Sequence, residues 1–431
     1  MKLDISETLS YINSIGSGSV KNSLSTIFRL CDLLGNPQDN LKVAHVAGTN
    51  GKGSVVAFVS HTMTLAGYRT GRFISPYIDV FNERISIDGE YITDTDLALY
   101  TERLKPAVET MRKEGEAPSW FAFLTVLAFC YFKDKGCDIV VMETGIGGLY
   151  DATNVVKSPV LSVITSVGYD HTKELGDSLT EIAIQKCGII KNNCPVVSSP
   201  QKDEVLAVIK SSSAEKNAPL FMPAQAHEVK CLDNGNTFVL PEHAVPFQTA
   251  LSGLYQVENA VTAICALEVL KDRGFVIEED ILHMGIETTS WVGRFQKLSE
   301  KPLIIADGAH NLSGMEAFCQ SIDTIYPSRN KIFVLGMVAD KDYASCIKRA
   351  CQSADQILAV TLNNPRSLGS ADICKEVSVY MKHVMDAKIA ENGMKMAMET
   401  CGDSDMICIC GSLFLVSESV SLWKKEFSEN I

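Results

Sequence analysis

The sequence has no apolar run that approaches the ~20 residues needed to span a lipid bilayer. Its first residues, Met1 to Ile5, lack the basic region and the apolar core of a signal peptide. Positive charge is also scarce, because 39 Lys and Arg residues face 52 Asp and Glu residues and leave a net charge of -13. A nucleic-acid surface needs a basic field. We therefore expect a cytoplasmic protein with no membrane and no nucleic-acid partner, although a local pocket for a small anion stays open.

Cysteine is plentiful, but a metal-binding or disulfide pattern is missing. The fourteen cysteines are scattered, and the only close pair, Cys408 and Cys410, lies on an apolar run that reads as a buried strand. This spacing fits neither a zinc site nor a disulfide framework. We expect reduced thiols that pack in the core.

Short apolar runs alternate with longer helical patterns in the 431 residues, which predicts βαβ units and a largely parallel sheet. The length calls for two or three domains. In the first part of the chain, the expected strands are 42–47, 138–142 and 160–164, and the expected helices are 55–66 and 120–132.

A second α/β series begins near Pro302, with expected strands at 303–306, 331–335, 356–360 and 406–410. The polar stretch 296–301 between the two series is the best candidate for a linker. This predicts two domains, 1–296 and 297–431. The region 201–250 is less regular and is interpreted as a peripheral subdomain.

A glycine-rich loop, Gly48-Thr49-Asn50-Gly51-Lys52-Gly53-Ser54, lies between an expected strand and an expected helix. Backbone N–H groups of such a loop and of the helix N-terminus form a cradle for phosphate oxygens. Lys52 is suited to the β- and γ-phosphates of ATP, and the Ser54 hydroxyl to Mg²⁺. The alternative, a plain glycine turn, leaves both side chains unexplained. The spacing is not the standard Walker pattern, because the leading glycine stands three residues before Gly51 rather than five.

Two polar residues follow the next expected strands, at the edge where open α/β sheets place their sites. Glu143 ends a buried strand, and a carboxylate there can hold a hard cation beside a triphosphate. A carboxylate that caps a loop is the alternative. His171 follows the strand at 160–164, and on local sequence alone a hydrogen-bonded loop residue is the better interpretation.

The stretch Ala47 to Ser54 resembles the phosphate loop of the Mur ligase superfamily, and its Lys-Gly-Ser ending is similar to that of the folylpolyglutamate synthase and dihydrofolate synthase family. The other motifs that resemble this family follow in order along nearly the whole chain. They are Ser75-Pro76-Tyr77, Phe81 to Ile85, Glu143 to Asn154, Asp170 to Gly176, Gln185 to Lys191, Tyr255 to Ala260, Trp291 to Phe295, Asp307 to Asn311, Asp340 to Asp342 and Gly411 to Leu413.

The resemblance implies an N-terminal P-loop ATPase-like domain with a mostly parallel sheet and a smaller, Rossmann-like C-terminal α/β domain. It implies that ATP is bound by the loop and by residues further along the chain. The implied nucleotide-binding residues are Thr49, Asn50, Gly51, Lys52, Gly53, Ser54, Asn259, Arg294 and Asp307. For Asn259 and Arg294, a helix N-terminal cap and a surface arginine are the alternatives.

The resemblance also implies one or two Mg²⁺ ions, held by Ser54, Ser75, Glu143 and His171. Lys186 matches a lysine that relatives carbamylate, which turns a cation into a carboxylate that supports the metal site. An ordinary surface lysine on a helix is the alternative for Lys186.

The implied substrates are a folate or dihydropteroate and L-glutamate. The residues assigned to them are Arg84, Phe121, Ala122, Tyr150, Asp151, Ala152, His310 and Ser412, with His310 near the incoming amino acid. Two departures from the family pattern fall on the pterin side, because Ala122 replaces a glutamate and 23–27 replaces a Gly-Leu-x-Arg-Ile pattern. A third departure, Tyr77 in place of a histidine, lies in the loop of Ser75.

A carboxylate and an amine do not condense unaided in water. Transfer of the γ-phosphoryl group to the carboxylate makes an acyl phosphate, which the glutamate amine attacks, and Lys52, Lys186 and His310 are the residues implied in this chemistry. We expect an ADP-forming amide ligase that adds glutamate to folates, and a monomer, as relatives commonly are. The alternatives are a Mur-type ligase on a peptidoglycan precursor, which lacks support because no uridine-nucleotide domain precedes the loop, and a P-loop phosphotransferase.

Overall fold

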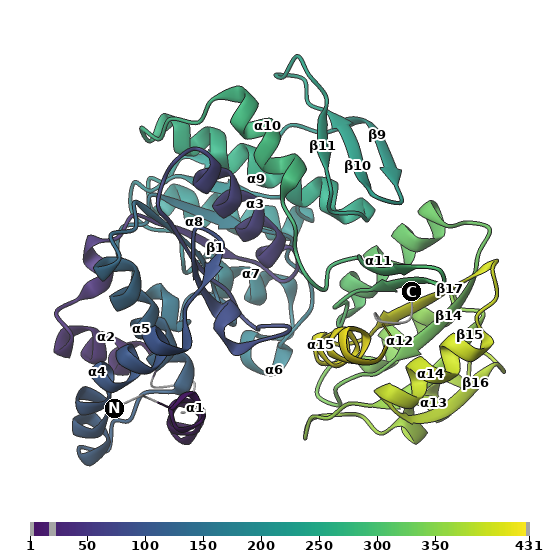
Figure 1. Cartoon of the computed structure of the whole chain (residues 1–431). Coiled ribbons are helices and arrows are strands. Elements are labelled where there is room, and N and C mark those ends of the chain that lie inside the picture. Colours follow the sequence, from purple (N-terminus) through teal and green to yellow (C-terminus); the bar gives the residue numbers. More distant parts are fainter. Residues whose placement is uncertain (1–3, 17–22, 428–431) are drawn as a thin grey trace. The chain divides into compact units, whose positions relative to one another are not determined.

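The computed structural model describes residues 4–16 and 23–427, and contacts divide the chain into two compact units (Figure 1). The first unit contains the chain up to Gly168 together with 172–225 and 259–286. The second contains 169–171, 226–258 and the chain from Glu287 onward. The expected division into two domains, 1–296 and 297–431, stays a prediction.

Within the described residues, the first unit is built on an eight-stranded sheet of order β4-β3-β2-β5-β1-β6-β7-β8. The strands from β2 to β8 in this order run parallel, whereas β3 and β4 extend one edge in antiparallel pairing. The strands are β1 Val43–Ala47, β2 Thr70–Phe73, β3 Ile85–Ile87, β4 Glu90–Tyr91, β5 Ile139–Glu143, β6 Leu161–Ile164, β7 Val196–Ser198 and β8 Leu220–Phe221.

Helices surround this sheet because its central strands are apolar on both faces and must be covered. The helices of this part are α1 Ile5–Ser14, α2 Ser23–Leu33, α3 Lys52–Leu65, α4 Asp94–Lys113, α5 Trp120–Asp134, α6 Thr172–Leu175, α7 Leu179–Cys187, α8 Asp203–Glu215, α9 Leu254–Asp272 and α10 Glu279–Thr288. The described residues also form the short 3₁₀ helices η2 Pro37–Asn40, η3 Phe81–Arg84 and η4 Ala152–Val155. Residues 254–258 of α9 and the last two residues of α10 group with the second unit.

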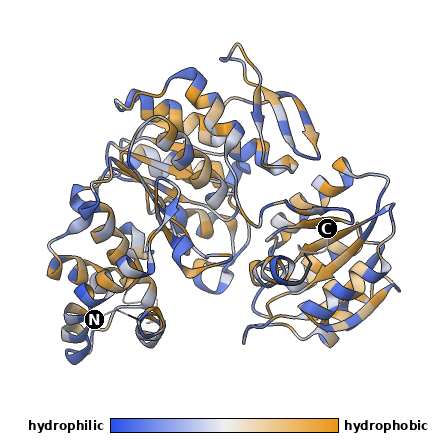
Figure 2. Cartoon of the chain, in the orientation of Figure 1, coloured by the Kyte–Doolittle hydropathy of each residue, from blue (hydrophilic) through white to orange (hydrophobic). Residues whose placement is uncertain are grey.

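The second unit contains a six-stranded sheet of order β12-β13-β17-β14-β15-β16 and a small antiparallel sheet of order β11-β10-β9. Figure 2 shows the central strands of the larger sheet in the hydrophobic colour. The strands are β9 His227–Leu232, β10 Gly235–Val239, β11 Phe247–Thr249, β12 Gln296–Glu300, β13 Leu303–Ala306, β14 Asn330–Leu335, β15 Gln356–Thr361, β16 Val384–Ile389 and β17 Asp405–Cys410. The helices are α11 Leu312–Ile325, α12 Tyr343–Cys351, α13 Ser370–Val377, α14 Ala390–Thr400, α15 Leu413–Leu422 and the π-helix η5 Trp423–Phe427.

The expected fold class, a mostly parallel α/β domain followed by a smaller α/β domain, is confirmed. The expected helix at 120–132 is α5, which begins after the N-cap Ser119 and runs two residues further. The helix after the glycine loop begins at Lys52 rather than at residue 55. Glycine is a poor helix former, so Gly53 hid this first turn in the sequence pattern.

The interpretation of 296–301 as a linker is wrong. Gln296–Glu300 form β12, an edge strand that pairs antiparallel with β13. Its polar composition reflects its place at the edge of the sheet, where one side of the strand stays open to water. The region 201–250 is also more regular than expected, because it contains α8, β8 and the three-stranded sheet.

All fourteen cysteines are free thiols, as expected. Eight are buried, and the other six are partly exposed rather than in the core. Within the described residues, no helix combines the length and apolar character that crossing a membrane requires.

Candidate functional site

The carboxyl ends of three neighbouring strands define the candidate site in the first unit. β1 lies between β5 and β6, with Val46 opposite Glu143 and Ala47 opposite Ile164. Because the three strands are parallel, the loops that follow them leave the sheet at the same edge. The glycine loop, Glu143 with its own glycine-rich loop, and Thr165 therefore meet there.

Hydrogen bonds fix the first half of the glycine loop to the segment after β6. The N–H groups of Thr49 and Asn50 both donate to the Ser166 carbonyl, at 2.8 and 3.2 Å, and Thr165 Oγ1 donates to the Asn50 carbonyl at 2.8 Å. A Cβ on Gly48 would overlap with Thr165. The N–H groups of 52–54 lie in the first turn of α3, where no carbonyl within the helix can accept them. The part of the loop suited to phosphate is therefore 51–54.

Asn259 of α9 packs directly on this loop. Gly51 has a φ of +86°, and a Cβ there would overlap with Asn259 Oδ1. This left-handed conformation and the close approach both require glycine at position 51. The structure therefore places Asn259 beside the loop and inside a helix, so the alternative of a helix N-terminal cap is wrong.

Lys52 and Glu143 face each other across the site. Lys52 Nζ donates to the Thr49 carbonyl at 3.2 Å and lies 3.8 Å from Glu143 Oε1. The other carboxylate oxygen of Glu143 accepts a hydrogen bond from Ser75 N at 3.3 Å. Ser54 is buried in the first turn of α3, two residues after Lys52. The structure thus gathers a lysine, a carboxylate and two serines around one edge of the sheet.

Lys186 lies in the last turn of α7 and is only 3% exposed, so it is not an ordinary surface lysine. Its Nζ donates to the Gly48 carbonyl at 2.7 Å. A capping box holds the start of α7, where Ser178 Oγ accepts from Glu181 N and the Glu181 carboxylate accepts from Ser178 N. Lys186 therefore joins α7 to the phosphate loop.

Arg84 is a buried cation enclosed by aromatic rings. Its guanidinium lies 5.0 Å from the centre of the Tyr77 ring, 5.7 Å from Phe81 and 5.1 Å from Trp120. Arg84 is 6% exposed, and burial lowers the pKa of its guanidinium to about 10, so it stays charged at neutral pH. Nη1 donates to Ser75 Oγ at 3.1 Å, while Nε is buried and has no hydrogen-bond partner in the part of the chain that the structure describes. Such a group favours an anion.

The other residues assigned to the acceptor differ in their exposure. Phe121 packs against Phe73 and Trp120, with ring centres 5.8 and 5.7 Å apart. Ala122, in the first turn of α5, is 2% exposed and belongs to the apolar core. Tyr150 is 56% exposed.

Asp151 is the N-cap of the short helix η4 and Ala152 is its first residue, and both are buried. The Asp151 carboxylate accepts hydrogen bonds from Gly145 N at 2.9 Å and Ile146 N at 3.0 Å. Burial raises the pKa of Asp151, and these hydrogen bonds oppose the shift. Asp151 thus anchors the backbone just after Glu143.

In the second unit, Asp307 follows β13 and is enclosed by donors. Its carboxylate accepts from Tyr255 Oη at 2.5 Å, Phe295 N at 2.8 Å and Ala309 N at 2.8 Å. Burial raises the pKa of Asp307, and the charge of Arg294 opposes that shift. A Cβ on Gly308 would overlap with the Arg294 guanidinium, so Arg294 lies against this motif and not on an isolated surface.

His171, His310 and Ser412 also belong to the second unit. His171 Nε2 lies 3.1 Å from Lys341 Nζ, and His310 Nδ1 lies 2.7 Å from the Gly308 carbonyl. Ser412 is buried and caps α15, where its Oγ accepts from Phe414 N at 3.1 Å. Ser54, Ser75 and Glu143, the other residues assigned to the metal, are grouped with the first unit.

Comparisons with known proteins show the family to which the chain belongs. The Mur ligase middle domain model matches residues 46–267, and the Mur ligase glutamate ligase domain model matches 293–413. The chain is 34% identical over 408 residues to a dihydrofolate synthase/folylpolyglutamate synthase of Bacillus subtilis (strain 168), covering 93% of this chain and 94% of the relative. It belongs to the folylpolyglutamate synthase and dihydrofolate synthase family.

Other members of the family are similarly close. A folylpolyglutamate synthase of Lacticaseibacillus casei is 31% identical over 427 residues, covering 96% of this chain and 97% of the relative. The structure of a Mycobacterium tuberculosis folylpolyglutamate synthase complexed with ADP superposes with a TM-score of 0.91 at 26% identity, covering 98% of both chains. This solved member therefore shares the fold of nearly the whole chain.

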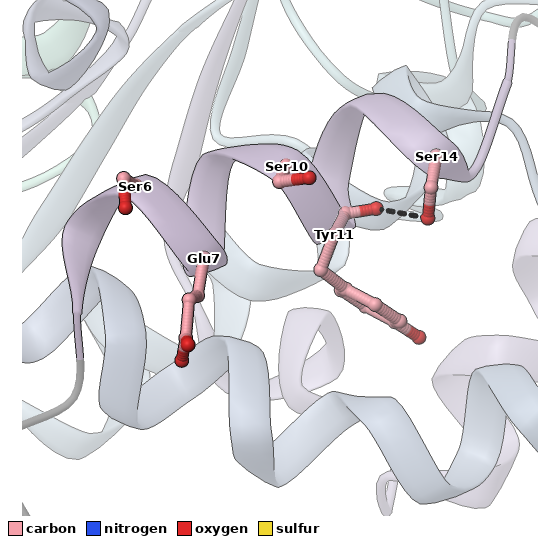
Figure 3. A pocket seen from close by; sticks show the side chains of 5 residues that line it. All are labelled: Ser6, Glu7, Ser10, Tyr11 and Ser14. Carbon is pink, nitrogen blue, oxygen red and sulfur yellow. Dashed lines mark hydrogen bonds between the residues drawn. The ribbon is translucent and has the colours of Figure 1, made fainter.

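Of two hollows on the surface, one is lined by a residue that the family motifs assign and the other is not. One, of about 470 Å³, follows one face of α1 and is lined by Ser6, Glu7, Ser10, Tyr11 and Ser14 (Figure 3). It contains no residue that the family motifs assign. The other, of about 330 Å³, lies in the second unit between 233–234, 250–252 and 289–297, and includes Arg294.

One buried polar residue of this family member escaped the sequence analysis. His45 lies in the middle of β1 and is fully buried. Its Nε2 lies 2.7 Å from Thr153 Oγ1. The available signal was a single histidine inside the otherwise apolar run Val43-Ala44-His45-Val46-Ala47.

Proposed function

We propose that the protein is an ATP-dependent ligase that joins the amine of L-glutamate to a carboxylate of a folate, with release of ADP and phosphate. The observation that carries this function is the cluster at the ends of β1 and β5, where Lys52, Glu143, Ser75 and Arg84 are linked by contacts. It occurs in a chain whose relatives are folylpolyglutamate and dihydrofolate synthases. The bound ADP of the Mycobacterium tuberculosis enzyme supports ATP as the phosphoryl donor.

The reaction needs two steps, each of which uses charges that this chain supplies. The acceptor carboxylate attacks the γ-phosphorus of ATP, which forms an acyl phosphate and releases ADP. The glutamate amine then attacks the acyl carbon, which forms the amide and releases phosphate. In this proposal, Lys52 balances charge on the phosphates, and the buried Arg84 holds an anionic part of the acceptor. Asn259, Arg294 and Asp307 are assigned to the nucleotide, and His310 and Ser412 to glutamate.

The residues also fit a magnesium ion. Ser54 and Ser75 offer hydroxyl oxygens and Glu143 a carboxylate oxygen, which are the donors that Mg²⁺ prefers. When bound, Mg²⁺ would neutralise charge on the transferring phosphoryl group. We keep His171 as a further ligand in this proposal, together with a second ion. Lys186 would support the site as a carbamate, and its buried amine beside Gly48 supports a position near the phosphates.

An assay with separate substrates tests this function. Purified protein with ATP, Mg²⁺ and tetrahydrofolate should release ADP only when glutamate is added, and chromatography should show a folate longer by one glutamate. Dihydropteroate is the second acceptor to be tested in the same way. ADP release that does not depend on glutamate would indicate a phosphotransferase instead, and no product with any folate or dihydropteroate would refute the proposal.

The family membership decides against a Mur-type ligase acting on a peptidoglycan precursor, because relatives that match over nearly their whole length are synthases of folates. We further propose that the protein works in the cytoplasm as a monomer. Size-exclusion chromatography with light scattering tests the oligomeric state.

A further inference from the structure

His45 makes a polar contact that the packing of β1 does not need. The strand is buried on both faces, and its other four residues are Val or Ala. His45 is fully buried at the centre of the eight-stranded sheet. Its Nε2 lies 2.7 Å from Thr153 Oγ1, and its Nδ1 has no hydrogen-bond partner among the described residues. A histidine in such a place costs stability unless its polar atoms are used.

The contacts of Thr153 determine which ring nitrogen of His45 carries the hydrogen. Thr153 donates twice to Asp151 Oδ1, from Oγ1 at 2.5 Å and from N at 3.0 Å. Because the single hydroxyl hydrogen goes to the carboxylate, Oγ1 accepts from His45, which must carry its hydrogen on Nε2. Nδ1 is then an unprotonated acceptor, so no N–H group is left without a partner there. Burial lowers the pKa of His45 to about 3, so the ring stays neutral.

The chain of hydrogen bonds continues from Asp151 to the backbone after Glu143. Asp151 Oδ2 accepts from Gly145 N at 2.9 Å and Ile146 N at 3.0 Å. Four donors thus fill both oxygens of the carboxylate. A Cβ on Gly145 would lie 2.7 Å from the Phe121 ring, so the backbone that Asp151 holds is in contact with Phe121.

We propose that His45 is a positioning residue for the acceptor pocket. By donating to Thr153, it keeps the Asp151 carboxylate turned toward Gly145 and Ile146, and this fixes the backbone against which Phe121 packs. Asp151 then acts on the acceptor through the backbone that it holds, since both its oxygens are occupied. This inference rests on the proposed function, because it takes Phe121 and Asp151 as part of the pocket for the pterin-bearing substrate.

The test removes the Thr153 hydroxyl, which links His45 to the Asp151 carboxylate. Thr153→Val keeps the shape of the side chain and removes the hydroxyl, whereas Thr153→Ser keeps the hydroxyl. His45→Leu removes the donor, and His45→Gln retains an N–H donor. We expect Thr153→Val and His45→Leu to raise the KM for tetrahydrofolate about tenfold, because each loses one hydrogen bond in the series that holds the Asp151 carboxylate. The KM for ATP should stay within about twofold of wild type. Thr153→Ser and His45→Gln should restore most of the affinity.

Thr101→Val is the matched control. Thr101 is buried in α4, and its Oγ1 has no hydrogen-bond partner among residues 4–16 and 23–427. The same substitution there should leave both KM values unchanged. An unchanged KM for tetrahydrofolate in Thr153→Val, or an equal rise in both KM values, overturns the positioning role. Failure of the proposed function is a separate result, because it would be seen in the wild-type protein, which would then make no product.

Discussion

Gly51 and Gly67 have nearly the same backbone conformation, with φ values of +86° and +87°, but different surroundings. A Cβ at Gly51 would overlap with Asn259, whereas a Cβ at Gly67 meets nothing within 4 Å in the described part of the chain. Both alanine variants pay about 1–2 kcal/mol for a left-handed residue. Only Gly51→Ala should also displace the phosphate loop, with a loss of about a hundredfold in kcat/KM for ATP. ADP release measured with Gly67→Ala as the control checks this, and equal activity of the two variants would contradict it.

Lys52 supplies the charge nearest to Glu143 in the phosphate loop. We expect Lys52→Ala to lower kcat by roughly 10²–10³-fold, because its ammonium stabilises charge on the transferring phosphoryl group. The exposed Lys202 serves as the control, and Lys202→Ala should keep wild-type activity. A Lys52→Ala enzyme with more than about a tenth of the wild-type kcat would remove Lys52 from this role.

His45 also makes the stability of the protein depend on pH. Burial lowers its pKa from 6.5 to about 3, so between these values the unfolded chain binds a proton that the folded chain does not. Stability is therefore full above pH 6.5 and falls as the pH drops through this window. Between pH 7 and pH 5, His45 should account for about 2 kcal/mol of lost stability. Urea unfolding of His45→Gln should show that much less loss than wild type, and parallel curves would refute the assignment.

For single residues, the motifs predicted which side chains lie near one another, but not how deeply each side chain is buried. Contacts link Lys52 to Glu143, Glu143 to Ser75 and Ser75 to Arg84, while their roles in one site stay predictions. The burial of Ala122 depends on how α5 packs into the apolar core, which no local pattern contains. Replacing Ala122 by glutamate, the family's usual residue, would bury a charge there unless a partner is supplied.

The element scale shows how α7 is held at the phosphate loop. The capping box of Ser178 and Glu181 stabilises the first turn of α7. Lys186, in the last turn, donates to the Gly48 carbonyl of the phosphate loop. We expect Ser178→Ala to destabilise this helix by about 1 kcal/mol, which is about a fivefold faster hydrogen exchange of its amides. Ser178→Thr should behave like wild type, because threonine keeps the hydroxyl that accepts from Glu181 N and donates to the Glu181 carboxylate. Unchanged exchange in Ser178→Ala would show that the cap is not needed.

The elements that the sequence predicted correctly are those buried on both faces. β1, β5, β6 and β13 are short apolar runs, and their bounds agree with expectation within a residue or so. The two edge strands β12 and β16 were missed, because an edge strand has an open side and mixes polar with apolar residues. The start of α3 was missed for a different reason, since its first turn is also the phosphate loop.

At the scale of the whole molecule, the order of strands could not be read from local pattern. β1 pairs with β5 and β6, so its neighbours are set by packing between distant segments. The family motifs predicted the fold because a solved relative has the same fold over nearly the whole chain. The alternation of strands and helices alone predicted a parallel sheet, but not which strand lies at its centre.

Nucleotide binding should stabilise the whole protein. A ligand that binds only the folded state adds about 2.7 kcal/mol at a concentration of 100 times its Kd. We expect ADP with Mg²⁺ to raise the thermal unfolding temperature of the wild type and of Gly67→Ala, and to have little effect on Gly51→Ala. A similar rise in all three proteins would place the nucleotide away from the glycine loop.

The central place of β1 also has a consequence for synthesis on the ribosome. When the glycine loop has just been synthesised, the nascent chain does not yet contain β5 and β6, which flank β1 in the complete sheet. Lys186 and Asn259, which pack against the loop, come later still. We therefore expect the loop to bind nucleotide only after residue 259 has emerged, and the assigned residues Arg294 and Asp307 come even later. ATP in the cell should then not assist the early stages of folding, and fragments that end before this point should not retain the nucleotide.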